Sequence, residues 1–276
     1  MKRLTVAVAI VGALAAILVA SRLQPPTEIR QETPRPVPMP GEGTRPPGAA
    51  ASGLGPDMVR LPEGFCIDKT EVTRGQYEAW LKASPATAGQ PGGCSSNADF
   101  TPTCAWEPGS NSEQPVVCVD WCDAQAFCKA AGKRLCGNAQ GGGSYAFESY
   151  DDPKVSEWQA ACSSGGQFEY TYGNTFDTNL CRDADADDYT TWGLADVGSF
   201  AECHSPVAAY AKVFDLSGHA AEWDNSCKGD GPDDACRIRG GSFQHHAHGT
   251  RCAMGRELEW PRSYKVDAVS FRCCAD

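Results

Sequence analysis

The sequence predicts an α+β domain with little regular secondary structure that is held together by disulfides. Three observations predict it. Only three segments carry helix-start signals, the chain beyond about residue 165 is broken by glycine and asparagine around short β-prone pieces, and fifteen cysteines are present. A few helices followed by a long loop-rich region are typical of the α+β class. Because loops bury little apolar surface, we expect disulfides and metal ions to stabilise such a chain.

The helix-start signals are local and specific. Thr73 and Gln76 form a capping box ahead of an apolar helical face. Asp120 can cap a second helix, for which Gly132 is the stop signal, and Ser156 opens a third in "SEWQAAC". The pieces "RIRGGSF" and "AVSFRC" are rich enough in β-branched and aromatic residues to favour short strands.

Composition limits the classes of function. The chain has 276 residues, 41% of them apolar, with a mean hydropathy of −0.39 and a formal net charge of −11. These values are typical of a soluble globular domain. A nucleic-acid-binding protein needs a basic face for phosphate contacts, so the acidic balance argues against nucleic acid as a partner.

The N-terminal segment predicts export. Lys2 and Arg3 precede the uncharged apolar run Leu4–Ala20, so residues 1–21 form either a signal peptide or an N-terminal membrane anchor. Either alternative places the remainder in the periplasm, on the cell surface or outside the cell, and an uncleaved segment would contact the membrane. Residues 22–56 are proline-rich and are expected to be a disordered linker, which leaves 57–276 as the folded domain.

The cysteines indicate disulfides rather than zinc, because no C-x-x-C pair is present and an export signal precedes them. The odd count leaves at least one cysteine free or bonded to another chain. The turn-rich stretch "CKGDGPDDAC" predicts Cys227–Cys236, and the same argument gives Cys94–Cys104. Cys181–Cys203 is a further pair that we consider without a supporting motif, and the pairing of these two cysteines stays open. The sequence assigns no partners to Cys66, Cys118, Cys122, Cys136 and Cys274.

Six sequence motifs are, in combination, characteristic of one protein family. They are "FCIDKTEVTRGQYEAWL", "PVVCVDWCDAQAFCKAAGKRL", "DVGSF", "FDLSGHAAEW", "RIRGGSF" and "VSFRC". In this order and spacing the chain resembles the formylglycine-generating enzyme, or sulfatase-modifying factor, family over residues 57–276. The resemblance implies a modified C-type-lectin-like fold. It also implies two disulfides by position, Cys128–Cys273 and Cys162–Cys252.

The same resemblance implies two structural calcium sites. The acidic run at 182–189 does not match an EF-hand, because Asp188 stands where that loop needs glycine. The first implied site consists of the carboxylates of Asp215 and Glu222 and the carbonyls of Gly218 and Ala220. The second consists of Asn179, Asp188 (or Asp187) and the carbonyls of Leu180 and Thr190. His219 replaces an asparagine that is usual in this family.

The segment after "GGS" departs from the family. The active oxidases carry two copper-binding cysteines there, whereas this chain reads "SFQHHAHGTRC" and is three residues shorter. Counting from Ser242, the first of these positions is His245, and counting back from Cys252 the second is Ala247. Soft thiolates suit Cu(I) and neither residue supplies one. We therefore expect the copper–thiolate oxidation to be lost.

Two hypotheses remain for this loop. In the first, it lines a cleft of a non-catalytic binding or assembly module, stabilised by calcium, whose ligand is a peptide, protein or glycan. In the second, the chain is a metal-dependent oxidoreductase with copper or zinc on His246 and His248, because imidazole is a good ligand for both metals. The residues predicted to line the cleft are Gln244, His245, His246, His248, Arg251 and Arg256.

Overall fold

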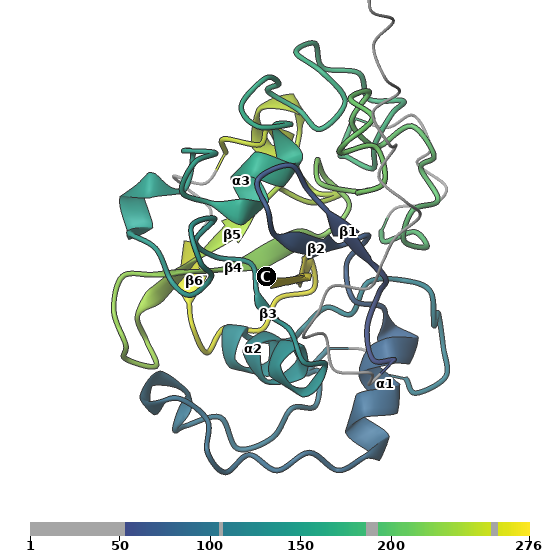
Figure 1. The fold of residues 1–276 in the computed structure, drawn as a ribbon. Helices are drawn as coiled ribbons and strands as arrows, with labels where there is room; N and C mark the ends of the chain where they lie inside the picture. The colour runs from purple at the N-terminus through teal and green to yellow at the C-terminus, as the bar shows by residue number, and fades with distance from the viewer. Residues whose placement is uncertain (1–52, 105–106, 186–192, 255–258) are drawn as a thin grey trace, which may run out of the picture. The chain divides into compact units, whose positions relative to one another are not determined.

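The computed structural model describes residues 53–104, 107–185, 193–254 and 259–276 (Figure 1). The expected signal or anchor at 1–21 and most of the expected linker lie outside these ranges. The last linker residues contact the folded domain: Leu54 packs against a buried apolar cluster, and the carbonyl of Pro56 accepts a hydrogen bond from Lys133 Nζ at 2.8 Å. No helix within the described ranges has the length and apolar character needed to cross a membrane.

Three α-helices form where the sequence places their caps. Helix α1 (Arg74–Lys82) and helix α2 (Trp121–Ala130) both begin with a complete capping box, on Thr73 and Asp120 respectively. Helix α3 (Glu157–Cys162) begins at Ser156, whose hydroxyl accepts from the N–H of Gln159 at 3.1 Å. Each cap satisfies an amide that the first helical turn leaves without a partner.

The strands of the described residues form two four-stranded sheets. The first is antiparallel, in the order β1-β2-β8-β3, and its strands are β1 (Met58–Arg60), β2 (Cys66–Asp68), β8 (Cys273–Ala275) and β3 (Arg134–Leu135). The second has the order β6-β5-β4-β7, with β4 and β7 parallel, and its strands are β6 (Glu259–Pro261), β5 (Ala235–Arg239), β4 (Ala221–Cys227) and β7 (Val269–Ser270).

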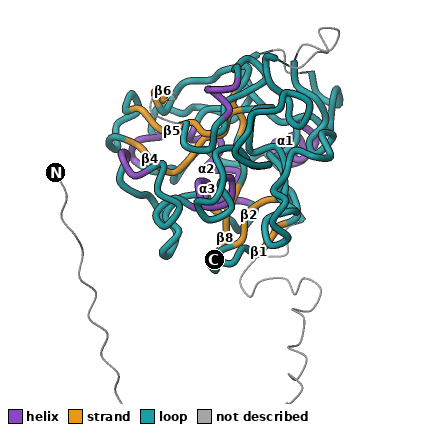
Figure 2. Tube along the Cα trace, turned by 90° about the horizontal axis from the view of Figure 1, so that it is seen from above, coloured by secondary structure: helices purple, strands orange, loops and turns teal. Residues whose placement is uncertain are grey.

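Most of the described chain is loop, as the sequence predicts (Figure 2). Short 3-10 helices interrupt the loops at η1 (Gly92–Cys94), η2 (Phe147–Ser149) and η4 (Ala247–Thr250). The α+β class with little regular structure and many disulfides is therefore confirmed.

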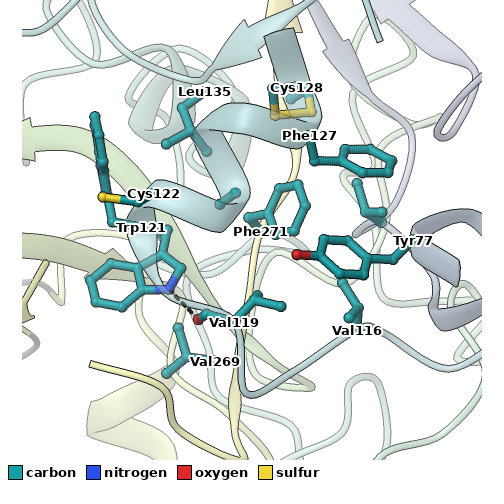
Figure 3. Close-up of a cluster of buried hydrophobic side chains, with 14 of the residues drawn as sticks. Tyr77, Val116, Val119, Trp121, Cys122, Phe127, Cys128, Leu135, Val269 and Phe271 are labelled. Carbon is teal, nitrogen blue, oxygen red and sulfur yellow. Dashed lines mark hydrogen bonds between the residues drawn. A yellow bond between two sulfur atoms is a disulfide. The ribbon is translucent and has the colours of Figure 1, made fainter. Parts of the chain in front are cut away.

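Aromatic side chains from the helices and the C-terminal segment build the larger apolar core. Tyr77 of α1 stacks on Phe127 of α2 at a centroid distance of 5.6 Å, and Phe127 meets Phe271 edge-on at 5.4 Å (Figure 3). A second apolar cluster surrounds the fully buried Trp158 of α3, with Ile67 of β2 and Leu216 among its members. Helix α2 thus packs against both sheets, through β3 of the first and β4 of the second, whereas Trp158 of α3 packs in the cluster that includes β2.

All fifteen cysteines lie within the described residues, and fourteen of them form disulfides. The pairs considered from the sequence include Cys128–Cys273, Cys162–Cys252, Cys181–Cys203 and Cys227–Cys236. The last of these joins register partners on β4 and β5. The remaining cysteine, Cys66, is buried in β2 without a disulfide partner.

The expected pair Cys94–Cys104 is wrong. Cys94 bonds to Cys122 in the first turn of α2, and Cys104 bonds to Cys118. Cys94 ends the short helix η1 and is buried against the core that α2 contributes to, so its partner comes from 28 residues away. Closeness in sequence was therefore the wrong criterion at this position. Cys136 and Cys274, which the sequence left unassigned, form the seventh pair.

Candidate functional site

The histidine loop, residues 242–251, is fixed at both ends. It follows β5 through Gly240 and Gly241, whose φ angles of 82° and 68° lie in the left-handed region that favours glycine. A Cβ atom on Gly241 would also collide with the carbonyl oxygen of Gly249, so the loop folds back on itself closely. At its far end the disulfide Cys162–Cys252 ties it to α3.

His245 is turned into the loop rather than out of it. Its Nδ1 accepts a hydrogen bond from the backbone N–H of Ser242 at 3.0 Å and lies 2.9 Å from the Ser242 hydroxyl. Burial, and then the neighbouring His246, lower the pKa of His245, so the neutral imidazole is favoured. The backbone oxygen of His245 accepts from Ala184, which joins this loop to the segment before residue 186. His245 therefore has a structural role in the loop.

His246 and His248 are exposed. His246 is the N-cap of the 3-10 helix η4, which spans Ala247–Thr250 and contains His248. His246 Nδ1 lies 2.6 Å from Asp185 Oδ1 in an exposed ion pair. Among the described residues, no set of three His, Cys, Asp or Glu ligand atoms forms at this loop. The described residues thus offer no third protein ligand for the expected copper or zinc site at His246 and His248.

The other expected cleft residues surround the two histidines only in part. Gln244 is exposed. Arg251 Nε donates to the hydroxyl of Tyr170 at 3.1 Å and lies 3.4 Å from a carboxylate oxygen of Glu169. Arg256 falls outside the described residues. The loop thus presents Gln244, His246, His248 and Arg251 as a polar surface, with Asp185 and Glu169 as its acidic partners.

A buried ionic cluster is connected to this loop by the backbone, because Phe243 N–H donates to the carbonyl of His219. Glu222 of β4 accepts hydrogen bonds on both carboxylate oxygens, from Arg272 Nε and Nη2 at 2.7 Å each and from Trp158 Nε1 at 2.8 Å. Both Glu222 and Arg272 are almost completely buried. This two-bond geometry compensates much of the cost of removing the two charges from water.

His219 occupies the centre of the cluster. Its Nδ1 lies 2.9 Å from Glu71 Oε1 and 3.9 Å from Asp215 Oδ2, and its Nε2 lies 3.0 Å from the carbonyl oxygen of Ala195. Burial alone would lower the pKa of His219, but the Glu71 carboxylate raises it to about 9. Burial, and then Glu71, raise the pKa of Asp215 to about 7. Near neutral pH the imidazolium is therefore the favoured form.

The cluster fits a further cation, although not with all the expected ligands. Three carboxyl groups, those of Glu71, Asp215 and Glu222, lie in this cluster with two cations, Arg272 and protonated His219. Glu71 Oε2 is buried without a hydrogen-bond partner, and the guanidinium of Arg272 lies 3.8 Å from it. Burying a polar atom without a hydrogen bond is costly. Ligand atoms of Glu71, Asp215 and His219 lie within 4.8 Å of one another. A cation here would use Glu71 and Asp215, whose carboxylates suit calcium.

Both oxygens of Glu222, one of the expected ligands, accept hydrogen bonds from Arg272 and Trp158. Glu71 is the residue that sequence reasoning missed. It lies in the quoted phrase "DKTEVT", 148 positions before His219, and only the tertiary fold brings the two together. The second implied calcium site cannot be evaluated as a whole, since Asp188 and Thr190 lie outside the described residues. Asn179 of that set hydrogen-bonds to Asp177 Oδ1 at 3.0 Å.

A family model described as "Sulfatase-modifying factor enzyme 1-like domain" matches residues 24–276. The chain belongs to this family. Two curated relatives carry the name "Inactive C-alpha-formylglycine-generating enzyme 2". The protein from Mus musculus is 29% identical over 175 residues, covering 59% of this chain and 49% of the relative. The protein from Bos taurus is 29% identical over 184 residues, covering 61% and 54%. The chain thus spans about half the length of these relatives.

Solved structures of the sulfatase-modifying factor fold agree with the architecture. PvdO from Pseudomonas aeruginosa superposes with a TM-score of 0.52 at 19% identity, covering 77% of this chain and 80% of PvdO. CarF superposes with a TM-score of 0.51 at 20% identity, covering 76% of this chain and 85% of CarF. At these identities the likeness shows the fold alone.

Proposed function

We propose that this protein is an exported, non-catalytic binding or assembly module of the sulfatase-modifying factor family. The observation that carries the proposal is that no cysteine thiol is accessible at the histidine loop. Fourteen cysteines are in disulfides, and the fifteenth, Cys66, is buried in a central position of the first sheet, where β2 pairs with both β1 and β8. A copper–thiolate oxidase needs two accessible thiolates at the histidine loop. The curated relatives' name, which includes "Inactive", supports the same proposal.

The decisive experiment is an oxidation assay. Purified protein with intact disulfides is incubated with Cu(I), oxygen and a sulfatase-type cysteine peptide, and the peptide is followed by mass spectrometry. We expect no conversion of the cysteine to the aldehyde. Conversion at a rate proportional to protein concentration would overturn the proposal.

The proposed binding surface is the polar face of the histidine loop, and its ligand is a peptide, protein or glycan. Gln244, His246 and His248 are exposed on it, while their removal should leave the core untouched. Peptide and glycan arrays probed with the intact protein should give signals that the triple variant Gln244→Ala/His246→Ala/His248→Ala loses. Gln140→Ala, an exposed change away from the loop, is the matched control. Signals that survive the triple change would place the binding surface elsewhere.

We also propose that calcium stabilises the domain through Glu71 and Asp215. Excess chelator should then lower the melting temperature by about 5–10 °C, the shift expected for losing a ligand held at a hundred times its dissociation constant. Glu71→Gln should remove the difference between chelated and calcium-loaded protein. If Asn179→Ala removes it instead, the second implied site binds the ion, and a melt that chelator does not change rules calcium out.

The oxidoreductase alternative has one observation in its favour, the convergence of His219 with Glu71 and Asp215. All three residues are at most 2% exposed. A substrate therefore has no direct access to a metal held there. The burial favours a structural ion at this cluster over a catalytic one.

Export is supported by the disulfide count, because seven bonds require an oxidising compartment. The proposed location is the periplasm, the cell surface or the extracellular medium, with residues 1–21 acting as a signal peptide or a membrane anchor. Fractionation of cells that express the full chain, followed by N-terminal sequencing of the mature protein, separates these alternatives.

A further inference from the structure

A cavity of about 350 Å³ lies between α2 and the loop of residues 85–91. Trp80 of α1 and Phe100 form its aromatic floor, with ring centroids 4.9 Å apart. Cys122 and Ala126 of α2 line one wall, and Pro85 and Pro91 of the loop line the opposite one. None of the lining residues belongs to the histidine loop or to the ionic cluster. The cavity is thus separate from the surface described above.

The cavity stays open because the side chains around it are small. The loop contributes Ala86, Ala88 and Gly89, and α2 contributes Ala126 and Ala130. A volume of this size falls within the range that small-molecule sites occupy.

The loop is also held away from the helix by fixed contacts. Gln90 Nε2 donates to the carbonyls of Thr87 at 3.1 Å and Asn97 at 3.0 Å, and Asn97 Nδ2 donates to Asp123 Oδ1 at 2.8 Å. The disulfide Cys94–Cys122 then ties the following segment to the first turn of α2. A preformed cavity spares a ligand the cost of ordering its site.

One end of the cavity is positively charged although the chain as a whole is acidic. Lys129 lines both this cavity and a neighbouring one that also contacts Lys133 and Arg134. Lys133 pairs with Asp68, and Arg134 pairs with Glu157. Lys129 is exposed and has no acidic partner within 4 Å in the part of the chain that the structure describes. An anionic group placed at this end would therefore meet an uncompensated ammonium.

We propose that this cavity binds a small free amphipathic carboxylate, of the size of a medium-chain fatty acid or a short aryl-alkanoic acid. Its apolar body lies in the cavity between the alanine and proline side chains of the loop and those of α2, above Trp80 and Phe100. Its carboxylate pairs with Lys129 at the mouth. Burial of the apolar body in this lining provides most of the affinity. The single cation fixes the orientation and selects an acid over a neutral molecule of the same length.

Isothermal titration of the intact, disulfide-bonded protein with octanoate tests the proposal, with octan-1-ol as the neutral probe. Ala126→Leu fills the cavity and should weaken octanoate binding at least tenfold. Lys129→Gln should weaken octanoate about two- to fivefold, the effect of a partly exposed ion pair, and leave octan-1-ol unchanged. Lys154→Gln, an exposed lysine that does not line the cavity, is the matched control and should change neither titration.

Ala88→Leu fills the cavity from the loop side and gives an independent answer if Ala126→Leu disturbs α2. Thermal melts identify which of the two variants keeps the fold. Absence of octanoate binding to the unaltered protein at millimolar concentration overturns the proposal. So does equal octanoate binding by a folded cavity-filled variant and by the unaltered protein. An octanoate affinity that Lys129→Gln leaves unchanged overturns the assignment of the carboxylate to Lys129.

Discussion

The adjacent disulfides Cys128–Cys273 and Cys136–Cys274 should be worth much less singly than together. They close loops with sequence separations of 145 and 138 residues. In the chain-entropy model, a bond that closes a loop of that length in an otherwise open chain stabilises by about 5 kcal/mol. Here each bond runs beside the other, since Cys273 and Cys274 are consecutive on β8. Each bond therefore constrains an unfolded chain that keeps the neighbouring bond less than it would constrain an open chain.

The magnitude follows from the shortest closed path in the unfolded chain. With Cys136–Cys274 intact, Cys128–Cys273 closes a ring of only about ten residues, so its removal should cost about 3 kcal/mol. The reverse removal gives the same figure. Once one of the two bonds has been removed, the other closes a long loop, which the disulfide Cys162–Cys252 shortens to about fifty residues. Removing this remaining bond therefore costs about 4 kcal/mol. The quadruple variant should then lose about 7 kcal/mol of unfolding free energy.

Equilibrium denaturation in guanidinium chloride of the two double alanine variants and the quadruple variant measures these differences. Either double variant should remain folded at 37 °C, whereas a loss of about 7 kcal/mol removes most of the stability of a typical domain. A loss of about 5 kcal/mol from one double variant would refute the shared-path reasoning. A quadruple variant that costs no more than the two doubles added together would refute it as well.

Three other predictions address the ionic cluster and the histidine loop. The pKa of His219 is raised to about 9, so the stability that protonated His219 adds to the folded domain is present in full below pH 6.5 and is lost as the pH rises through 9. In metal-free buffer the melting temperature should therefore fall over that window, and His219→Asn should flatten the fall. Arg272→Met leaves Glu222 buried without its cation and should lower the free energy of unfolding in urea by about 3–5 kcal/mol. Adding Glu222→Gln should restore part of the loss, and a cost below about 1 kcal/mol contradicts the ion pair. Gly241→Ala adds a collision with Gly249 to the strain of a positive φ and should destabilise more than Gly64→Ala, which meets nothing within 4 Å; equal melting temperatures would contradict this geometry.

The features that the sequence predicts correctly depend on neighbouring residues. The caps at Thr73, Asp120 and Ser156 act over three positions, and each begins a helix where expected. Cys227 and Cys236 are brought opposite each other by one hairpin. Cys94 failed the same criterion because its partner, Cys122, is selected by how η1 packs on α2. That packing depends on tertiary structure, and the ten residues that follow Cys94 do not indicate it.

The candidate site shows the same division. The absence of cysteine between Ser242 and Cys252 follows directly from the sequence. The roles of Glu71 and Glu222 could not be predicted, because each depends on a partner far along the chain. His219 is 148 residues from Glu71, and Arg272 is 50 residues from Glu222. The position of a carboxylate within a motif indicates that it could bind a metal ion. Whether its oxygens are available for that ion depends on the residues that surround it in the folded structure.

The stabilising parts of this domain are largely independent of the histidine loop. Cys252 at the loop's end is anchored by its disulfide and by its carbonyl, which accepts from the buried Arg239 at 2.9 Å. Inside the loop, the contacts of His245 are to Ser242 and Ala184. The exposed residues Gln244, His246 and His248 can therefore change without cost to the disulfides, the ionic cluster or the aromatic core. The same frame can carry different side chains at this surface, so the function depends on the residues of the loop and not on the fold alone.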